Sequence, residues 1–281
     1  MQRQGTARGA HSAVRRIDSA ANPEWKTLRK ALHLGGAVED RYWLVETPRL
    51  LDEAFRSGIR IPRVYATGTH LPELRERYAS STATEWVEIG GRALESLSTM
   101  DSQQGLIALA EKPQISVADF FASQRWVVVL DRIQDPGNAG SIVRSAEAFG
   151  ATGVVFLKGS ASPDAPKVLR ASAGSLFRIP FLGGLAAEHF LAACSGYALF
   201  AASPEACQRL DEVRFRFPGA LVIGNEGAGV SDVLDSAAEG FRIPMERVES
   251  LNAAVSAGIA LYQMGLQFKA SAAKREKGVG R

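Results

Sequence analysis

The sequence predicts an α/β protein whose C-terminal half is a mostly parallel sheet covered by helices on both faces. From Arg125 onward, short apolar runs typical of buried strands alternate with helical segments, as in parallel βαβ units. Upstream, residues 22–95 carry shorter strands and helices, which predicts a second, smaller α/β unit. The chain has 281 residues, 46% hydrophobic and 22% charged, so it can form two ordinary globular cores.

The smaller unit is predicted to begin with a helix at Pro23, because proline fits the first helical turn and Asn22 is a favoured N-cap residue. The strand, helix and two strands expected after it are short: 41–45, 47–55, 63–67 and 85–89. Beyond them, a Ser/Thr-rich stretch leads to Gln104-Gly105 and another short apolar strand. We interpret this segment as a linker to the larger unit.

The larger unit is a regular series of strands and helices. The expected strands are 126–130, 153–157, 197–202, 220–223 and 241–243, and the expected helices are 139–149, 163–173 and a long final helix from about residue 250. A glycine-rich turn follows strand 220–223, and a further helix is expected to start at Ser231-Asp232.

The helix at 139–149 is predicted to bury one face. Asn138 suits its N-cap, and Ile142, Ala146 and Phe149 recur on a single side. Arg144 lies about 200° around the helix from Ile142, so it points away from that side. From helical position alone, Arg144 would be an ordinary solvated arginine.

The final helix is predicted to be packed rather than exposed. Apolar residues recur along it at steps of four, four, three and four, which predicts one buried face: Leu251, Val255, Ile259, Tyr262 and Leu266. Small residues such as Ala253, Ala254, Ala257 and Gly258 lie between them, and such residues let a second backbone approach closely.

Composition excludes several classes of protein. No apolar run approaches the length of a membrane helix, and the basic N-terminus has no apolar core segment of a signal peptide, so a cytoplasmic location is expected. Two cysteines and four scattered histidines predict neither a disulfide framework nor a metal site. The net charge of +3 permits an RNA partner without requiring one, and the basic residues at both ends fit solubilising tails as well as phosphate contacts.

Three short motifs carry a resemblance to a known family. N-x-G-x-x-x-R stands at 138–144 directly after a strand, GNEG stands at 224–227, and IPM and ESLN stand at 243–245 and 249–252. In this order they resemble motifs 1, 2 and 3 of the SpoU (TrmH-like) branch of the SPOUT RNA methyltransferases. Each motif alone would be a weak signal, whereas three in the right order are a strong one.

The resemblance implies details of the fold that periodicity does not show. In the family, the C-terminal helix is threaded through an earlier loop as a trefoil knot, which forms the cofactor pocket. The N-terminal α/β unit resembles an RNA-binding domain related to a ribosomal protein fold, although a helper domain without RNA contact remains an alternative. The implied parts are a disordered basic arm, an RNA substrate-binding domain, a linker, a SpoU methyltransferase domain and a basic tail: 1–21, 22–95, 96–124, 125–270 and 271–281.

The resemblance also implies the cofactor and the site. The methyl donor would be S-adenosylmethionine, whose in-line displacement requires placement of two reactants and no metal. The positions that match the family's catalytic residues are Arg144, Asn138, Glu226, Ser250 and Asn252, and those that match its cofactor-binding residues are Gly224, Gly227, Ile243, Met245 and Leu251. Without the resemblance, Glu226 would be a turn acid, and Ser250 and Asn252 would be helix-cap residues.

Arg144 matches the family arginine that lies at the dimer interface and points at the ribose and phosphate of the RNA. Because a guanidinium stays protonated at neutral pH, we interpret Arg144 as a clamp and electrostatic group, and as a base only if its proton affinity is strongly perturbed. A homodimer with shared sites is therefore expected. The small residues of the final helix would equally suit a knot loop of the same chain.

The expected activity is methylation of a ribose 2′-hydroxyl in structured RNA, ribosomal RNA rather than transfer RNA. A transfer RNA methyltransferase and a non-catalytic RNA-binding or ribosome-assembly protein of the same fold remain alternatives. A nicotinamide enzyme is unsupported, because the glycine spacing 224–227–229 is not G-x-G-x-x-G and follows a late strand.

Overall fold

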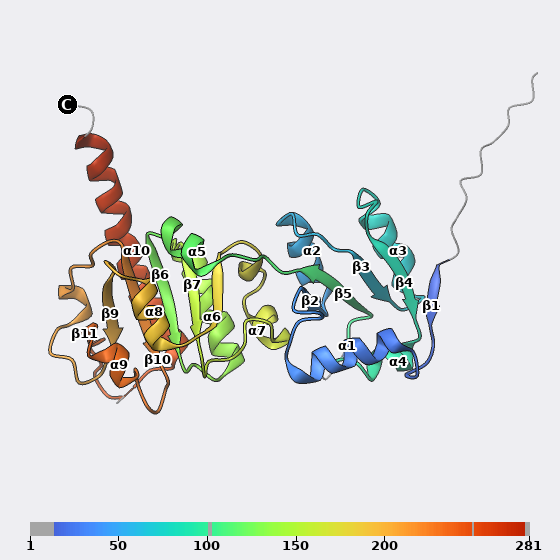
Figure 1. The fold of residues 1–281 in the computed structure, drawn as a ribbon, viewed down its shortest axis with the longest axis horizontal. Helices are drawn as coiled ribbons and strands as arrows, with labels where there is room; N and C mark the ends of the chain where they lie inside the picture. The colour runs from blue at the N-terminus through green and yellow to red at the C-terminus, as the bar shows by residue number, and fades with distance from the viewer. Residues whose placement is uncertain (1–13, 101–102, 249, 279–281) are drawn as a thin grey trace, which may run out of the picture.

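The chain folds into two lobes side by side, joined by a single extended crossing (Figure 1). The structure, a computed structural model, describes residues 14–100, 103–248 and 250–278. The N-terminal lobe is built on a five-stranded sheet and the C-terminal lobe on a six-stranded sheet.

The five-stranded sheet has the order β1-β4-β3-β5-β2, with parallel pairing of β4 to β1 and β3 and antiparallel pairing of β5 to β3 and β2. Its strands are β1 (Arg15–Ile17), β2 (Tyr42–Val45), β3 (Arg63–Ala66), β4 (Glu85–Ile89) and β5 (Leu106–Glu111). The helices of this lobe are α1 (Pro23–Leu34), α2 (Pro48–Arg56), α3 (Leu71–Arg77) and α4 (Gly91–Glu95). Asn22 caps α1 as predicted, because its side chain accepts a hydrogen bond from the backbone N–H of Glu24.

Two predicted boundaries of this lobe are wrong. The basic arm was expected to run through residue 21, but Arg15–Ile17 form β1, which pairs with β4 and buries Ile17. Residues 1–13 lie outside the described part of the chain. The linker was expected over 96–124, but its apolar strand is β5, which lies inside the first sheet between β3 and β2. Both errors arise because local sequence marks a short strand without showing which strands it pairs with.

The six-stranded sheet has the order β11-β9-β10-β6-β7-β8, and all its described pairs are parallel, which confirms the predicted parallel α/β architecture. Its strands are β6 (Trp126–Asp131), β7 (Gly153–Leu157), β8 (Phe181–Leu185), β9 (Ala198–Ala202), β10 (Gly219–Gly224) and β11 (Glu239–Phe241). Its helical segments are α5 (Val117–Ser123), α6 (Pro136–Phe149), α7 (Pro166–Ala171), η1 (Ser175–Phe177), α8 (Ala187–Ala193), α9 (Asp232–Asp235) and α10 (Ala253–Gly278).

Sequence patterns missed α5, β8 and α8. The strand β8 contains Gly183-Gly184, which interrupts its apolar pattern, and the two helices have only seven residues each. Such short helices depend on tertiary packing for their stability. Here Phe120 of α5 and Phe190 of α8 are fully buried in one cluster beneath the sheet.

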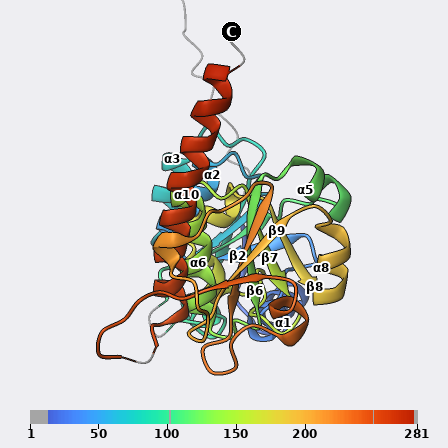
Figure 2. The same cartoon turned by 90° about the vertical axis from the view of Figure 1, so that its left-hand side faces the viewer.

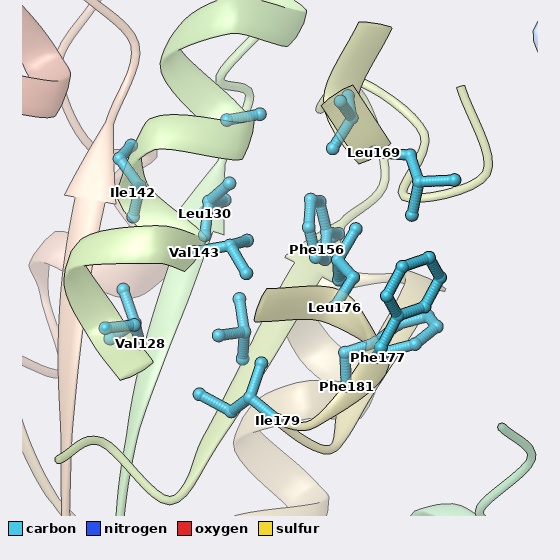
Figure 3. Packing of buried hydrophobic residues seen from close by; sticks show 14 of the residues in the cluster. Val128, Leu130, Ile142, Val143, Phe156, Leu169, Leu176, Phe177, Ile179 and Phe181 are labelled. Carbon is cyan, nitrogen blue, oxygen red and sulfur yellow. The ribbon is translucent and has the colours of Figure 1, made fainter. Parts of the chain in front are cut away.

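The main core lies between the six-stranded sheet and α6. Figure 3 shows Val128 and Leu130 of β6 facing Ile142 and Val143 of α6, with Phe156 of β7 beside them. Ile142 and Ala146 are buried as predicted, and Phe149 is half-buried at the edge of the same cluster. Arg144 is exposed, as its place on the helix predicted.

The prediction for α10 is wrong about which face is buried. The residues that contact the core are Ala253, Ala257, Ala260, Leu261 and Met264. The longer side chains expected to be inside are on the outside, with exposures of 51% for Val255, 40% for Ile259, 53% for Tyr262 and 48% for Leu266. The small side chains face inward because α10 lies close against α6 (Figure 2), so the helix presents an apolar stripe to its surroundings.

The two lobes are held together by buried contacts on both sides of α7. Trp43 of β2 lies against Phe177 and Phe181, with ring centroids 5.7 and 5.5 Å apart, and its indole N–H donates to Asp164 Oδ1 at 2.8 Å. Glu46, 1% exposed, pairs with Arg170 of α7. Trp43, Phe177 and Phe181 belong to one core cluster that spans both lobes, so the lobes have a packed interface rather than a free hinge.

Among the described residues, no helix is both long and apolar enough to cross a membrane. In the same residues, no group of three or more His, Cys, Asp and Glu side chains is arranged to hold a metal ion. The cytoplasmic location and the absence of a metal stay predictions.

Candidate functional site

A cavity of about 400 Å³ lies at the carboxyl ends of β9, β10 and β11. In parallel α/β sheets, ligands bind at this edge, where loops leave the strands. The cavity is lined by the loop after β9, the glycine-rich turn after β10, the segment after β11 and the start of α10. Every predicted cofactor-binding residue is part of this lining: Gly224, Gly227, Ile243, Met245 and Leu251.

The glycine-rich turn is folded back on itself by Asn225. Its backbone exchanges hydrogen bonds with Gly229, at 3.0 and 2.9 Å, and its side-chain oxygen accepts from the N–H groups of Gly227 and Ala228, both at 3.0 Å. Gly224 is required at the base of this hairpin, because a Cβ there would lie 2.4 Å from the backbone of Gly229. At Gly227 a Cβ would meet only Asn225 Oδ1, at 3.6 Å, so that position is open toward the cavity.

One chain of hydrogen bonds joins the three sequence motifs. The side-chain amide of Asn138 donates to Glu226 Oε1 at 2.5 Å, and the amide of Asn252 donates to Asn138 Oδ1 at 3.0 Å. Asn138 lies in the first turn of α6. Glu226, in the glycine-rich turn, is 88 residues further along the chain, and Asn252, just before α10, is 114 residues further. Asn138 therefore fixes the turn and the start of the last helix relative to α6.

Asn138 is not the N-cap of α6, contrary to the prediction. The helix starts at Pro136, three residues before the predicted start, and Asp135 is the cap, since its side chain accepts from the Asn138 N–H at 2.7 Å. Proline at the first helical position favours this earlier start. The consequence is functional, because capping by Asp135 leaves the amide of Asn138 free to bind Glu226 and Asn252.

Ser250 and Asn252, the polar pair of the third motif, have different surroundings in the structure. Asn252 caps α10 by accepting from the N–H groups of Ala254 and Val255, at 2.9 and 3.3 Å. Ser250 is exposed and lines the cavity, and it is not part of the hydrogen-bond chain through Asn138. The helix-cap interpretation is thus correct for Asn252, which also keeps its contact with the first motif.

Arg144 lies outside this cavity. It lines a second cavity of about 340 Å³ between the lobes, together with residues of α2 and α7. Within one subunit, the structure brings together Asn138, Glu226 and Asn252 beside the first cavity, whereas Arg144 faces another space.

Sequence reasoning missed three residues that shape the site: Asn225, Asp131 and Asp135. The carboxylate of Asp131, 3% exposed, accepts from the Ser231 N–H at 2.6 Å and anchors the far end of the turn. The side-chain amide of Asn225 donates to the carbonyl of Arg132 at 3.0 Å. An Asn at the start of a glycine-rich turn and an Asp before a proline are local signals for turns and caps, and could have been used.

The first cavity has walls suited to a nucleoside. Ile223, Ile243 and Leu251 supply apolar surface, and the exposed turn supplies backbone carbonyl groups that its internal hydrogen bonds leave unused. Small-molecule sites combine such apolar walls with a few placed polar groups. Serine hydroxyls and carboxylates line this cavity, but among the described residues no hydrogen bond joins a serine of the lining to one of its carboxylates, so the arrangement suits binding and orientation rather than covalent catalysis.

Comparison with protein families agrees with this geometry. Residues 125–262, which hold the six-stranded sheet and the first cavity, match the model of the SpoU rRNA Methylase family. An uncharacterized tRNA/rRNA methyltransferase of Synechocystis is 31% identical over 90% of this chain and 94% of its own length.

Two further relatives have more specific names. The 23S rRNA (guanosine(2553)-2′-O)-methyltransferase RlmP of Bacillus subtilis is 28% identical over 89% of this chain and 99% of its own length. The crystal structure of an AdoMet-bound rRNA methyltransferase from Sinorhizobium meliloti superposes with a TM-score of 0.76 at 26% identity, covering 89% of this chain and 97% of that one. The likeness thus extends over both lobes.

Proposed function

The chain belongs to the SpoU rRNA methylase family, and we propose that it transfers a methyl group from S-adenosylmethionine to a ribose 2′-hydroxyl of RNA. The observation that carries this proposal is the cavity at the carboxyl edge of the sheet, around which all three motifs meet. The Glu226–Asn138–Asn252 chain ties the first motif to Glu226 of its lining and to the start of α10. Relatives named as 2′-O-methyltransferases and an AdoMet-bound structural neighbour support it.

The residues of the cavity fit S-adenosylmethionine. A side chain at Gly227 would project into open space toward the cavity, so the bare backbone there leaves room for a ligand to lie against the turn. Ile243 and Leu251 would hold the adenosine between apolar walls, and backbone groups of the turn would bind its polar edges. The sulfonium of the donor makes its methyl group reactive, so the protein needs to bind and orient the reactants without supplying a nucleophile of its own.

Arg144 supplies the RNA side of the reaction in this proposal. Its guanidinium stays protonated, so it binds the phosphate next to the target ribose and favours the ionised form of the 2′-hydroxyl. Since Arg144 does not face the cavity of its own chain, the complete site requires a second subunit.

We infer that two chains form a homodimer through the α6–α10 face. The four exposed apolar side chains of α10 form a stripe on one side of the helix, and Arg144 lies on the exposed side of α6. A two-fold interface would cover both stripes at once and bring Arg144 of each subunit toward the partner's cavity.

The substrate we propose is ribosomal RNA, bound by the N-terminal lobe acting as an RNA-binding domain related to a ribosomal protein fold. Relatives named as rRNA methyltransferases support this choice over transfer RNA. The family resemblance also supports a trefoil knot, in which α10 follows a segment threaded through an earlier loop beside the cavity.

The test is a methyl-transfer assay with labelled S-adenosylmethionine and, separately, ribosomal and transfer RNA from cells that lack the gene. The parent protein is expected to label ribosomal RNA, with the label recovered as a 2′-O-methyl nucleoside. Arg144→Lys keeps the charge but loses the planar fork, so its turnover should fall about 100-fold while its affinity for S-adenosylmethionine stays unchanged.

Other outcomes decide between the alternatives. Label only in transfer RNA would favour a transfer RNA methyltransferase. Binding of S-adenosylmethionine without any transfer to either RNA pool would favour the non-catalytic protein of the same fold. Full turnover by Arg144→Lys would show that the planar fork is not what Arg144 contributes.

A further inference from the structure

The second cavity, between the lobes, carries an excess of positive charge that has no assigned role. Its lining comes from α2 of the N-terminal lobe and from α6, α7 and the turn after α7: Thr47, Arg49, Leu50, Glu53, Arg144, Arg170, Ala171 and Ala173. Three of these residues are arginines. We call this space the interlobe cleft.

The charges in the interlobe cleft are not all equivalent. Arg170 is neutralised by the buried carboxylate of Glu46, which also accepts from the N–H and hydroxyl of Thr99 at 2.9 and 2.7 Å. Glu53 is neutralised by Arg178, at 3.0 Å, and pairs more weakly with the largely exposed Arg56, at 3.3 Å. Among the described residues, Arg49 and Arg144 are exposed and make no ion pair, so the cleft as a whole attracts an anion.

The two free arginines come from different lobes, but their relative placement is fixed. The turn after α7 passes directly against α2, since a Cβ at Gly174 would lie 2.8 Å from Glu53 Cβ. Arg178 joins α2 to α6 by binding Glu53 and, at 2.5 and 2.9 Å, both oxygens of Glu147. The hydrogen bond to Glu147 raises the pKa of Arg178, so this bridge stays charged at neutral pH. The helix α2, which carries Arg49, is therefore held in a defined position relative to α6, which carries Arg144.

We propose that the interlobe cleft binds the phosphate backbone of the substrate RNA, and that Arg49 is a phosphate-binding residue that works with Arg144. The inference rests on the proposed function, because Arg144 is the group that would meet the target ribose. Two guanidinium forks that line one cavity suit phosphates of one strand, since each fork can bind a phosphate through two parallel hydrogen bonds. An RNA strand held in this way runs from the N-terminal lobe to the reacting ribose.

The cleft also explains why the lobes are joined by a packed interface. Arg49 is useful for positioning RNA only if its distance from Arg144 is constant. The buried pair of Glu46 with Arg170 and the aromatic contacts of Trp43 keep it so. In this scheme Arg170 is a positioning residue, which orients the lobes and does not itself bind RNA.

The test compares Arg49→Gln and Arg49→Glu with Arg56→Gln, a matched control on the same helix. The Arg56 side chain is 72% exposed and lies outside the cleft. The first probe is a fluorescein-labelled single-stranded oligouridylate, titrated at several salt concentrations. Arg49→Gln should weaken binding about 10-fold. It should also make the plot of log binding constant against log salt concentration less steep by about 0.7, which is the contribution of one phosphate contact. Arg49→Glu should weaken it further, and Arg56→Gln should match the parent.

A second readout separates positioning from fold damage. Affinity for S-adenosylmethionine should be equal in all four proteins. In the methyl-transfer assay, Arg49→Gln should raise KM for RNA about 10-fold and change kcat less than about 2-fold. The substitution removes a contact that is equally strong in the bound substrate and in the transition state. If Arg49→Gln and Arg56→Gln bind oligouridylate equally well, with equal salt slopes, the proposal is wrong.

Two controls keep this inference distinct from the proposed function. If polyglutamate competes as well as RNA, the cleft is a general anion site and the assignment to RNA falls. If the parent transfers no methyl group but Arg49→Gln still loses oligouridylate binding, the proposed enzyme activity fails while the RNA-binding role of the cleft stands.

Discussion

Asn138 and Gly227 contribute to the candidate cofactor cavity in opposite ways, one through its side chain and the other through the lack of one. Asn138 uses both ends of its amide, as donor to Glu226 and acceptor from Asn252, so its orientation is determined by partners on two other segments. Gly227 contributes by having no side chain, which leaves the turn backbone open to a ligand. The polar network gives the cavity its shape, and the glycine leaves it accessible.

Gly227→Val is predicted to weaken binding of S-adenosylmethionine by about 10- to 100-fold, because a branched side chain would project into the cavity. The fold should persist, since a Cβ at this position meets only Asn225 Oδ1 at 3.6 Å. Isothermal titration calorimetry with the cofactor measures the effect, and thermal unfolding checks the fold. Gly36→Val is the control, because that glycine has open space around it in the other lobe. Unchanged affinity in Gly227→Val would remove Gly227 from the site.

At the scale of elements, α10 has two faces with different functions. Its small side chains, together with Leu261 and Met264, face α6 and β10, and four other apolar side chains are exposed: Val255, Ile259, Tyr262 and Leu266. An apolar stripe exposed on a long helix is unfavourable in water unless another surface covers it. The homodimer proposed above supplies that surface.

Ile259→Arg is predicted to convert the protein to monomers. The interface would bury an unpaired guanidinium from each subunit, which costs several kcal/mol and raises the dimer Kd by about 100-fold or more. Sedimentation velocity at assay concentration measures the change, and methyl transfer should fall with it. Val233→Arg is the control, because Val233 is 43% exposed on α9, outside the stripe. If the Ile259→Arg protein sediments like the parent, the stripe of α10 does not form the dimer.

At the scale of the whole molecule, the structure separates two parts of the proposed site. The first cavity, which we propose holds the cofactor, lies at the carboxyl edge of the six-stranded sheet, whereas Arg144 lines the interlobe cleft. A reaction that needs both cannot be completed inside one chain in this arrangement. Two subunits related by a two-fold axis would exchange these parts reciprocally.

Subunit mixing tests this arrangement directly. At a cofactor concentration that saturates the parent but leaves Gly227→Val nearly empty, Arg144→Ala and Gly227→Val are each expected to be almost inactive alone. After subunit exchange in equal amounts, half the dimers are mixed, and each has one intact site of two. The expected activity is therefore about a quarter of the parent's. Mixtures that exchange subunits and stay inactive would show that Arg144 acts on the cavity of its own chain.

The sequence alone determined the larger part of the fold and the composition of the site. Apolar runs of strand length are strong local signals, and they located most strands of the parallel sheet within one or two residues. The motifs identified five residues as cofactor-binding, and all five line the first cavity. Strands and short motifs can be recognised in the sequence because each is defined by residues that lie within a few positions of one another.

Only the tertiary structure decided how these parts meet. The apolar face of α10 was assigned inward because periodicity shows that a stripe exists, and the direction of the stripe depends on the surface that covers it. The same limit applies to β5, whose partners lie at distant positions in the chain. It applies also to Asn138, which was predicted to cap α6. Asp135 caps that helix instead, and the side chain of Asn138 binds Glu226 and Asn252. The interlobe cleft could not be predicted at all, because its charge depends on which arginines are already paired: Arg170 has Glu46, while Arg49 and Arg144 have no such partner among the described residues.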